Sequence, residues 1–156
     1  MQKLMALQKL QSTALDLSNA DLRKYPFLPG KINLQNANLS HSNLALVALN
    51  KMDLRGADLS NSDLSGAFLN EANLSGANLE HANLTGANLN FAILTSANLQ
   101  NAILTKTVLT CANLSNADLS KSTVTQATIS GANFTNTITN DIVDYDSVSD
   151  SNINCS

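Results

Sequence analysis

The chain has 156 residues, of which 13% are charged and 4% aromatic, with no tryptophan and a net charge of −3. One domain is expected at this length, and so few aromatic residues argue against a bulky globular core. The negative net charge argues against nucleic-acid binding, which needs a basic surface. No run of about 18 apolar residues that could cross a membrane is present in the sequence.

Residues 1–13 are predicted to form an N-terminal cap on the repeats that follow. Three leucines in this segment have the i, i+3 spacing of a helix: Leu4, Leu7 and Leu10. Residues 2–11 are therefore expected to form a short capping helix. The segment lacks the continuous apolar core of a signal peptide, since Gln8 and Lys9 interrupt it. We therefore expect a cytoplasmic protein.

The stretch 72–90 reads ANLSGANLEHANLTGANLN, with Leu at every fifth residue and Ala two residues before each Leu. A period of five advances about 140° per step in an α-helix, so the Leu residues would occupy every side of it. In a continuous strand they would alternate between two faces. Both conflicts disappear if the chain bends once per repeat and keeps Ala and Leu inside. The pattern therefore predicts stacked coils whose backbones pair as parallel strands.

The register is unbroken from Leu34 to Phe134, which is 21 repeats. With the Leu site called i, position i−2 is Ala in 14 repeats, and position i−1 is Asn or Asp in 14, as an outward, solvated site should be. Five of the six glycines fall at i+2, which indicates a corner that tolerates positive φ.

These repeats carry a resemblance to a known family. ANLSG, ANLTG and ADLSN resemble the A(D/N)LXX motif of the pentapeptide-repeat family, over roughly residues 15–135. The resemblance implies an all-β fold, a right-handed quadrilateral β-helix with four pentapeptides per coil. We expect about six coils over residues 14–136.

Both ends of the repeats are less regular. An earlier register runs through Leu17, Leu22 and Phe27, and the segment YPFLPGKI then inserts two residues before the register restarts. After the repeats, four apolar residues recur every five positions in a shifted register: Ile138, Val143, Val148 and Ile153. A degenerate last coil in that register would bury Asp141 and Asp146 at a cost of several kcal/mol each. We therefore favour an acidic C-terminal tail over residues 137–156.

The sequence predicts no catalytic, metal or cofactor site. His41 and His81 lie two coils apart, about 10 Å, which is too far to share a metal ion. Asp53, Asp58 and Asp63 would lie on three different faces of the coil. Cys111 has no His neighbour, and the glycines form no phosphate-binding loop. Two cysteines make a disulfide framework an improbable expectation. We predict that the chain is not an enzyme.

Three functional hypotheses remain. The best-characterised members of the resembled family mimic DNA, bind DNA gyrase and protect it, which requires dense negative charge along the rod. Here residues 1–56 have a net charge of +4 and residues 57–156 of −7, and the outward i−1 sites are Asn more often than Asp. The leading hypothesis is thus a non-catalytic rigid scaffold that binds a protein partner or itself. Gyrase inhibition and a structural rod without a specific partner are the alternatives.

Five outward apolar residues form the candidate interface: Phe68, Phe91, Ile93, Ile103 and Val108. With four pentapeptides per coil, Phe68 and Val108 share one face with Phe91 near it. Ile93 is expected just round the corner, and Ile103 on the neighbouring face. Single apolar residues on a surface are normal, so tolerated scatter is the alternative interpretation.

Overall fold

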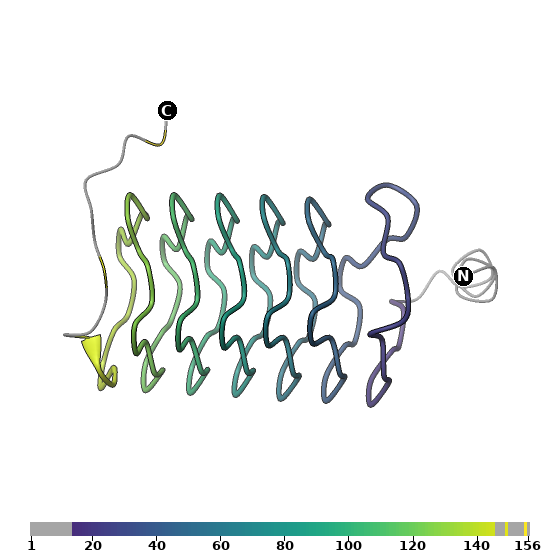
Figure 1. Cartoon of the computed structure of the whole chain (residues 1–156), viewed down its shortest axis with the longest axis horizontal. Coiled ribbons are helices and arrows are strands. Elements are labelled where there is room, and N and C mark those ends of the chain that lie inside the picture. The colour runs from purple at the N-terminus through teal and green to yellow at the C-terminus, as the bar shows by residue number, and fades with distance from the viewer. Residues whose placement is uncertain (1–13, 146–148, 150–154, 156) are drawn as a thin grey trace.

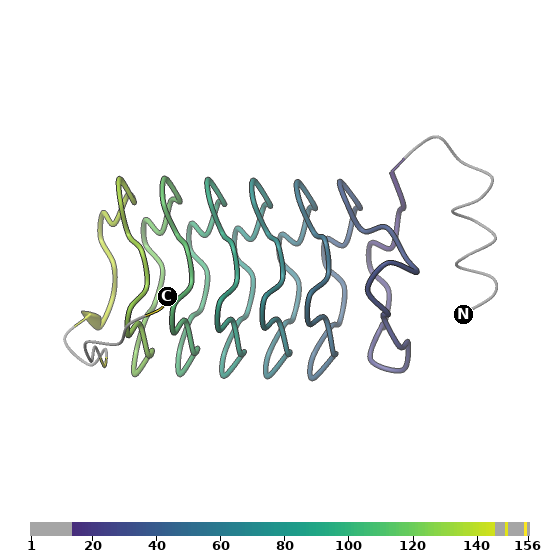
Figure 2. The same ribbon diagram turned by 90° about the horizontal axis from the view of Figure 1, so that it is seen from above.

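The computed structural model describes residues 14–145, Ser149 and Cys155. The described chain forms a rod of stacked coils (Figures 1 and 2). It contains no α-helix and no strand longer than one bridged residue, so neighbouring coils pair through single residues. The predicted capping helix lies outside the described residues. No helix in the described part of the chain is long and apolar enough to span a bilayer.

Each coil has four sides because it makes four bridges to the next coil. Between residues 38 and 133 every bridge joins a residue to the one 20 positions later, in parallel. One coil therefore pairs in turn through Asn38 with Asp58, Asn43 with Asp63, Ala48 with Phe68, and Asp53 with Asn73. The first of these bridge columns starts at Asp16 and ends at Ile138, with six coil-to-coil intervals between them.

The core consists of the inward Ala and Leu residues that the period of five predicts. Ala77, Leu79 and Leu84, for example, are fully buried. The Leu79 N–H donates to the Asn98 carbonyl of the next coil at 2.7 Å, and the Ala77 N–H closes the preceding turn on Leu74. Burial and backbone pairing thus depend on the same register, which is why the core repeats without a break.

Corner residues adopt the left-handed backbone conformation. Apart from glycines, 19 described residues have positive φ, most of them at the i+2 corner sites, with values from 54° to 62°. This conformation carries a steric cost of about 1–2 kcal/mol for residues with a Cβ. The cost explains the glycines at this site, and the coil pairs tightly enough to impose the conformation on many other residue types.

Asn and Asp at i−1 have a structural role that solvation alone does not explain. In all 14 repeats that carry them, the side-chain Oδ1 accepts a hydrogen bond from the backbone N–H of residue i+1. The Ser75 N–H, for example, donates to Asn73 at 3.1 Å. This Asx turn closes each corner locally.

The predicted two-residue insertion near the N-terminus is confirmed. Asp16 pairs with Asn38 and Asp21 with Asn43, so each pair is two positions further apart in sequence than the pairs of later coils. The extra residues form a turn in which the Lys31 N–H donates to the Leu28 carbonyl at 3.0 Å. Later coils return to the regular spacing, so a corner absorbs the insertion.

The favoured interpretation of residues 137–143 as part of an acidic tail is wrong, and so is its alternative, a coil in the shifted register of Ile138 and Val143. Both residues bridge to the preceding coil at the usual spacing, and both side chains point outward and are exposed. Pairing with the coil beneath fixes the register, and Thr137 and Ile142 take the inward sites instead. Residues 137–143 therefore continue the solenoid as a degenerate coil, without the burial of carboxylates that the shifted register required. Val148 and Ile153 lie outside the described residues.

A disulfide joins Cys111 to Cys155, with 5.5 Å between the two Cα atoms. The expectation that no disulfide forms is therefore wrong. Ser149 pairs with Thr128, one position beyond the usual spacing, and Cys155 lies against the Gly131 carbonyl. Gly131 follows Cys111 in the same corner column, one coil later. Cys155 therefore contacts the Gly131 carbonyl and bonds to the cysteine of the preceding coil. A sequence separation of 44 gives no sign of this contact.

Candidate interaction face

Two opposite sides of the rod differ in the residues at their outward centre. On one side, the Asn/Asp face, all five repeats between residues 38 and 118 carry Asn or Asp at i−1. On the opposite side, the apolar face, the central column consists of Ala48, Phe68, Asn88, Val108 and Thr128. Only Asn88 in this column makes an Asx turn. Four of the five repeats on the apolar face therefore lack the corner hydrogen bond that an i−1 Asn or Asp would accept.

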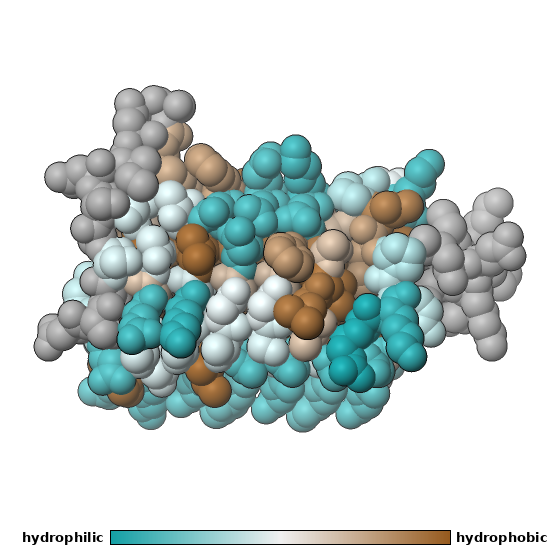
Figure 3. All heavy atoms as spheres, viewed as in Figure 1, coloured by the Kyte–Doolittle hydropathy of each residue, from teal (hydrophilic) through white to brown (hydrophobic). Residues whose placement is uncertain are grey.

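The corners beside the apolar face add further exposed apolar side chains. Leu46 is 72% exposed, and it lies over Gly66, where an added Cβ would be 2.7 Å from Leu46 Cδ2. Phe91, at the other corner, is 54% exposed, and Phe68 between the two corners is 46% exposed. Figure 3 shows such hydrophobic residues gathered near the middle of one side of the rod, between hydrophilic ones.

The five predicted interface residues divide over three sides. Phe68 and Val108 both bridge to Asn88, so they lie in one column two coils apart, with Phe91 at the adjacent corner. Val108 is only partly exposed, less than Phe68 or Phe91. Ile93 belongs to the next side and Ile103 to the preceding one. Phe68, Phe91 and Val108 are therefore brought together, whereas Ile103 is separate.

Sequence reasoning missed Leu46 and Leu28 as members of the exposed apolar surface. Leu46 occupies an i+2 corner, where Gly or Asn is the usual residue, so a scan of that column would have found it. Leu28 belongs to the inserted turn, whose direction the repeat pattern does not determine. Both side chains are exposed.

The other polar candidates do not form a site. His41 and His81 lie at exposed corners in one column, two coils apart, as expected. Asp53, Asp58 and Asp63 lie in three different columns. No cluster of three possible metal ligands occurs among the described residues. These side chains are corner and outer-face residues of the coil.

Local hydrogen bonds stabilise several exposed carboxylates. Arg23 donates to Asp21 at 2.7 Å and lowers the pKa of that carboxyl to about 2. Arg55 similarly lowers the pKa of Asp53. The Ser120 hydroxyl and backbone lower the pKa of Asp118, with a further contribution from Gln100. All three carboxylates are thus held ionised as structural groups.

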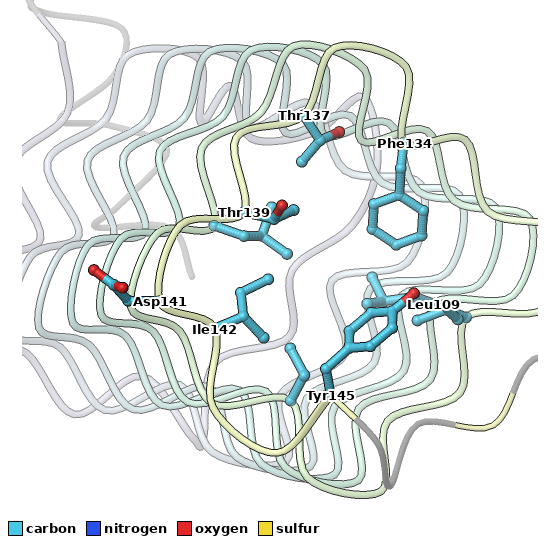
Figure 4. A pocket seen from close by; sticks show the side chains of 10 residues that line it. Leu109, Phe134, Thr137, Thr139, Asp141, Ile142 and Tyr145 are labelled. Carbon is cyan, nitrogen blue, oxygen red and sulfur yellow. The ribbon is translucent and has the colours of Figure 1, made fainter.

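A cavity of about 550 Å³ lies at the C-terminal end of the core. Figure 4 shows Phe134, Ile142 and Tyr145 around the open interior of the last coil. Thr139 lines this cavity at an inward site where the five preceding coils have Leu, so it fills less of the core than those residues do. Among the described residues that line the cavity, Asp141 is the only carboxylate.

Comparisons with known proteins agree with the repeat pattern. The chain matches the family described as pentapeptide repeats, with eight copies over residues 32–70, 72–110 and 104–136. It is similar to a solved pentapeptide repeat protein from Nostoc PCC 7120, with 30% identity, coverage of 73% of this chain and 84% of that one, and a TM-score of 0.35. No curated protein matches the chain.

Two further solved structures are more distant. A pentapeptide repeat protein from the thylakoid lumen of Arabidopsis thaliana has 24% identity and a TM-score of 0.39, over 67% of this chain and 62% of that one. This chain thus spans less than two thirds of the Arabidopsis protein. The plasmid-mediated fluoroquinolone resistance protein QnrB1 has 20% identity and a TM-score of 0.33, over 90% of this chain and 92% of that one.

Proposed function

Because this chain belongs to the pentapeptide-repeat family, we propose that it is a non-catalytic, rigid interaction module that binds a protein partner through its apolar face. Membership implies a right-handed quadrilateral β-helix, in agreement with the four bridges per coil. One observation carries the proposal. The apolar face lacks the Asx turn in four of five repeats, whereas the opposite face keeps it in all five.

The missing turns make scatter a weaker explanation. A hydrogen bond of this kind contributes about 0.5–1.5 kcal/mol, and less where water competes. Phe68 and Val108 forgo that contribution and expose apolar surface to water. Contiguous exposed apolar side chains commonly mark an interaction site.

The rigidity of the coil favours binding at this face. Both backbone polar groups of Phe68 are bonded to the preceding coil, because its N–H donates to Val47 at 2.9 Å and its carbonyl accepts from Leu49 at 2.7 Å. A partner would therefore cost the backbone little conformational entropy here. The apolar side chains of this surface could remove roughly 300–500 Å² from water, enough for a weak or moderate complex.

Two other features bear on the proposal. The Asn-rich outer faces lack the dense carboxylates of a DNA mimic, so gyrase inhibition remains the less favoured alternative. The Cys111–Cys155 disulfide is typical of proteins in oxidising compartments. We therefore favour such a compartment over the predicted cytoplasmic location.

A triple substitution tests the proposal: Phe68→Asn, Phe91→Asn and Val108→Asn. Wild type and variant are crosslinked in the native cells, and captured proteins are quantified by mass spectrometry. The variant should fold normally and lose the captured partner. A matched control on the opposite face, Asn38→Ser with Asn98→Ser, should retain it. Equal capture by wild type and triple variant, with unchanged sedimentation, would refute the interface and favour the inert rod.

A further inference from the structure

Charge is segregated around the rod, and the apolar face lies on the basic side. The corners that border it, including the inserted turn, carry four lysines and one carboxylate, a net charge of +3: Lys24, Lys31, Lys51, Lys106 and Glu71. The remaining described residues carry three cationic side chains and nine carboxylates, a net charge of −6. The central column of the apolar face has no charge at all.

The bridges between coils indicate where these lysines lie. Because Asp21 pairs with Asn43 and the Tyr25 N–H closes a turn on Leu22, Lys24 lies in the turn of the first coil that leads to the corner column of Leu46. Lys106 lies in the same corner column, two coils beyond Gly66. Lys24 and Lys106 are therefore four coils apart, about 19 Å, on either side of the most exposed apolar residue. Lys51, at the other corner, lies 3.4 Å from Glu71.

We propose that the partner of the apolar face is an acidic protein surface, with apolar side chains at its centre and carboxylates around its rim. This inference rests on the proposed interaction function and specifies its partner. Apolar contact with Leu46, Phe68 and Phe91 supplies the buried centre of such an interface. Rim carboxylates opposite Lys24 and Lys106 speed association and exclude basic partners.

Charge disfavours a second copy of the chain as the occupant. Two apolar faces packed against each other would bring two sets of lysines together, with a net charge of +3 on each side. Like charges placed opposite one another disfavour association. An acidic partner meets the same face without this repulsion.

The burial of the aromatic rings disfavours an anionic membrane as the occupant. Phe68 and Phe91 are only about half exposed, at 46% and 54%, because the rest of each residue packs on its own rod. A surface-bound membrane protein buries its apolar side chains about 5–10 Å deep in the interface. Rings that project so little from the rod can pack against a protein surface but cannot reach that depth in a membrane.

The test replaces Asn88, which lies between Phe68 and Val108 in the central column, by a photo-crosslinking amino acid, or Asn98 on the opposite face as a control. Crosslinking is done in the native cells, and the joined partner peptides are sequenced. We expect position 88 to capture peptides with more Asp and Glu than Lys and Arg. The double variant Lys24→Gln and Lys106→Gln should reduce capture about fivefold. Raising NaCl from about 0.05 to about 0.5 M in a lysate should have a similar effect.

The outcomes separate this inference from the proposed function. If capture falls in the apolar triple variant but not in the lysine double variant or in salt, the apolar face binds a partner that is not acidic. If the crosslinked peptides belong to this chain, the occupant is a second copy. Co-sedimentation with mixed phosphatidylcholine and phosphatidylserine vesicles but not with pure phosphatidylcholine ones, abolished by the same lysine changes, would replace the protein partner by a membrane. Any of these three results overturns the proposed partner class.

Discussion

Ile103→Asn tests whether an outward apolar residue is a structural cost. Ile103 is 43% exposed and occupies an i−1 site between Asn83 and Thr123 of the adjacent coils. Asn at this site should accept a hydrogen bond from the Thr105 N–H, as Asn98 does from Gln100. Its amide should also donate to Asn83, as Asn98 donates to Asn78 at 3.2 Å. The substitution thus exchanges apolar burial for two hydrogen bonds.

The magnitudes nearly cancel. Losing roughly 60 Å² of buried apolar surface costs ~1.5 kcal/mol at ~25 cal/mol/Å². Two partly exposed hydrogen bonds return about 1–2 kcal/mol. The stability of Ile103→Asn should therefore lie within about 1 kcal/mol of wild type. Ile103→Ala loses the same burial without the hydrogen bonds, so it should be less stable than the Asn variant by about 1–2 kcal/mol.

Thermal and urea denaturation followed by circular dichroism measures both differences. For a chain of this size, about 1 kcal/mol corresponds to a change of about 2–4 °C in Tm. Leu104→Asn is the matched control, because Leu104 is the fully buried neighbour on the chain. It should unfold the protein or destabilise it by several kcal/mol. If Ile103→Asn is no more stable than Ile103→Ala, the Asx turn does not contribute as argued.

Four further predictions follow from the core, the ends and the outer faces. Leu84→Asp should abolish cooperative unfolding, since it places a charge among fully buried leucines; a wild-type melting curve would disprove the register. Cys155→Ser should lower Tm to the value of reduced wild type, because loss of the 44-residue loop constraint reduces the free energy of unfolding by up to ~4 kcal/mol, whereas free-thiol labelling of the oxidised native protein would show that no disulfide forms. The pKa of Asp21 is lowered to about 2, so its stabilising contribution is complete above about pH 4 and is lost as pH falls through 2. Tm of wild type should therefore fall more than that of Asp21→Asn over this interval, and parallel curves would contradict the Arg23 contact. The protein should leave gyrase supercoiling unchanged at micromolar concentration, and stoichiometric inhibition would promote the DNA-mimic alternative.

The repeat pattern predicted the fold because the inward sites carry the same residue type, Leu or Ala, in most repeats. Leu79 and Leu84 can be buried together only if the chain bends every five residues. The function of Asn73 was predicted less completely, because an outward polar residue is explained equally well by solvation and by an Asx turn. Only the position of the Ser75 N–H separates the two explanations.

The C-terminal end was predicted poorly because its contacts are not local. Ile138 and Val143 suggest inward positions by hydropathy, but backbone pairing with the preceding coil places them outside. Cys111 and Cys155 form a disulfide although 44 positions separate them, which is not a multiple of the 20-residue coil. Leu46 was missed although it occupies the same kind of i+2 corner site as Phe91, which was included in the predicted interface.

The disulfide also determines how the molecule would respond to mechanical load. A force applied at the C-terminus passes from Cys155 directly to Cys111, so the chain between them carries none of it. That segment of 44 residues would add about 150 Å of extension if the disulfide were reduced. In the oxidised protein, coils can unwind under tension only on the N-terminal side of Cys111. The final coils then stay folded as an anchored block while the rest of the rod extends.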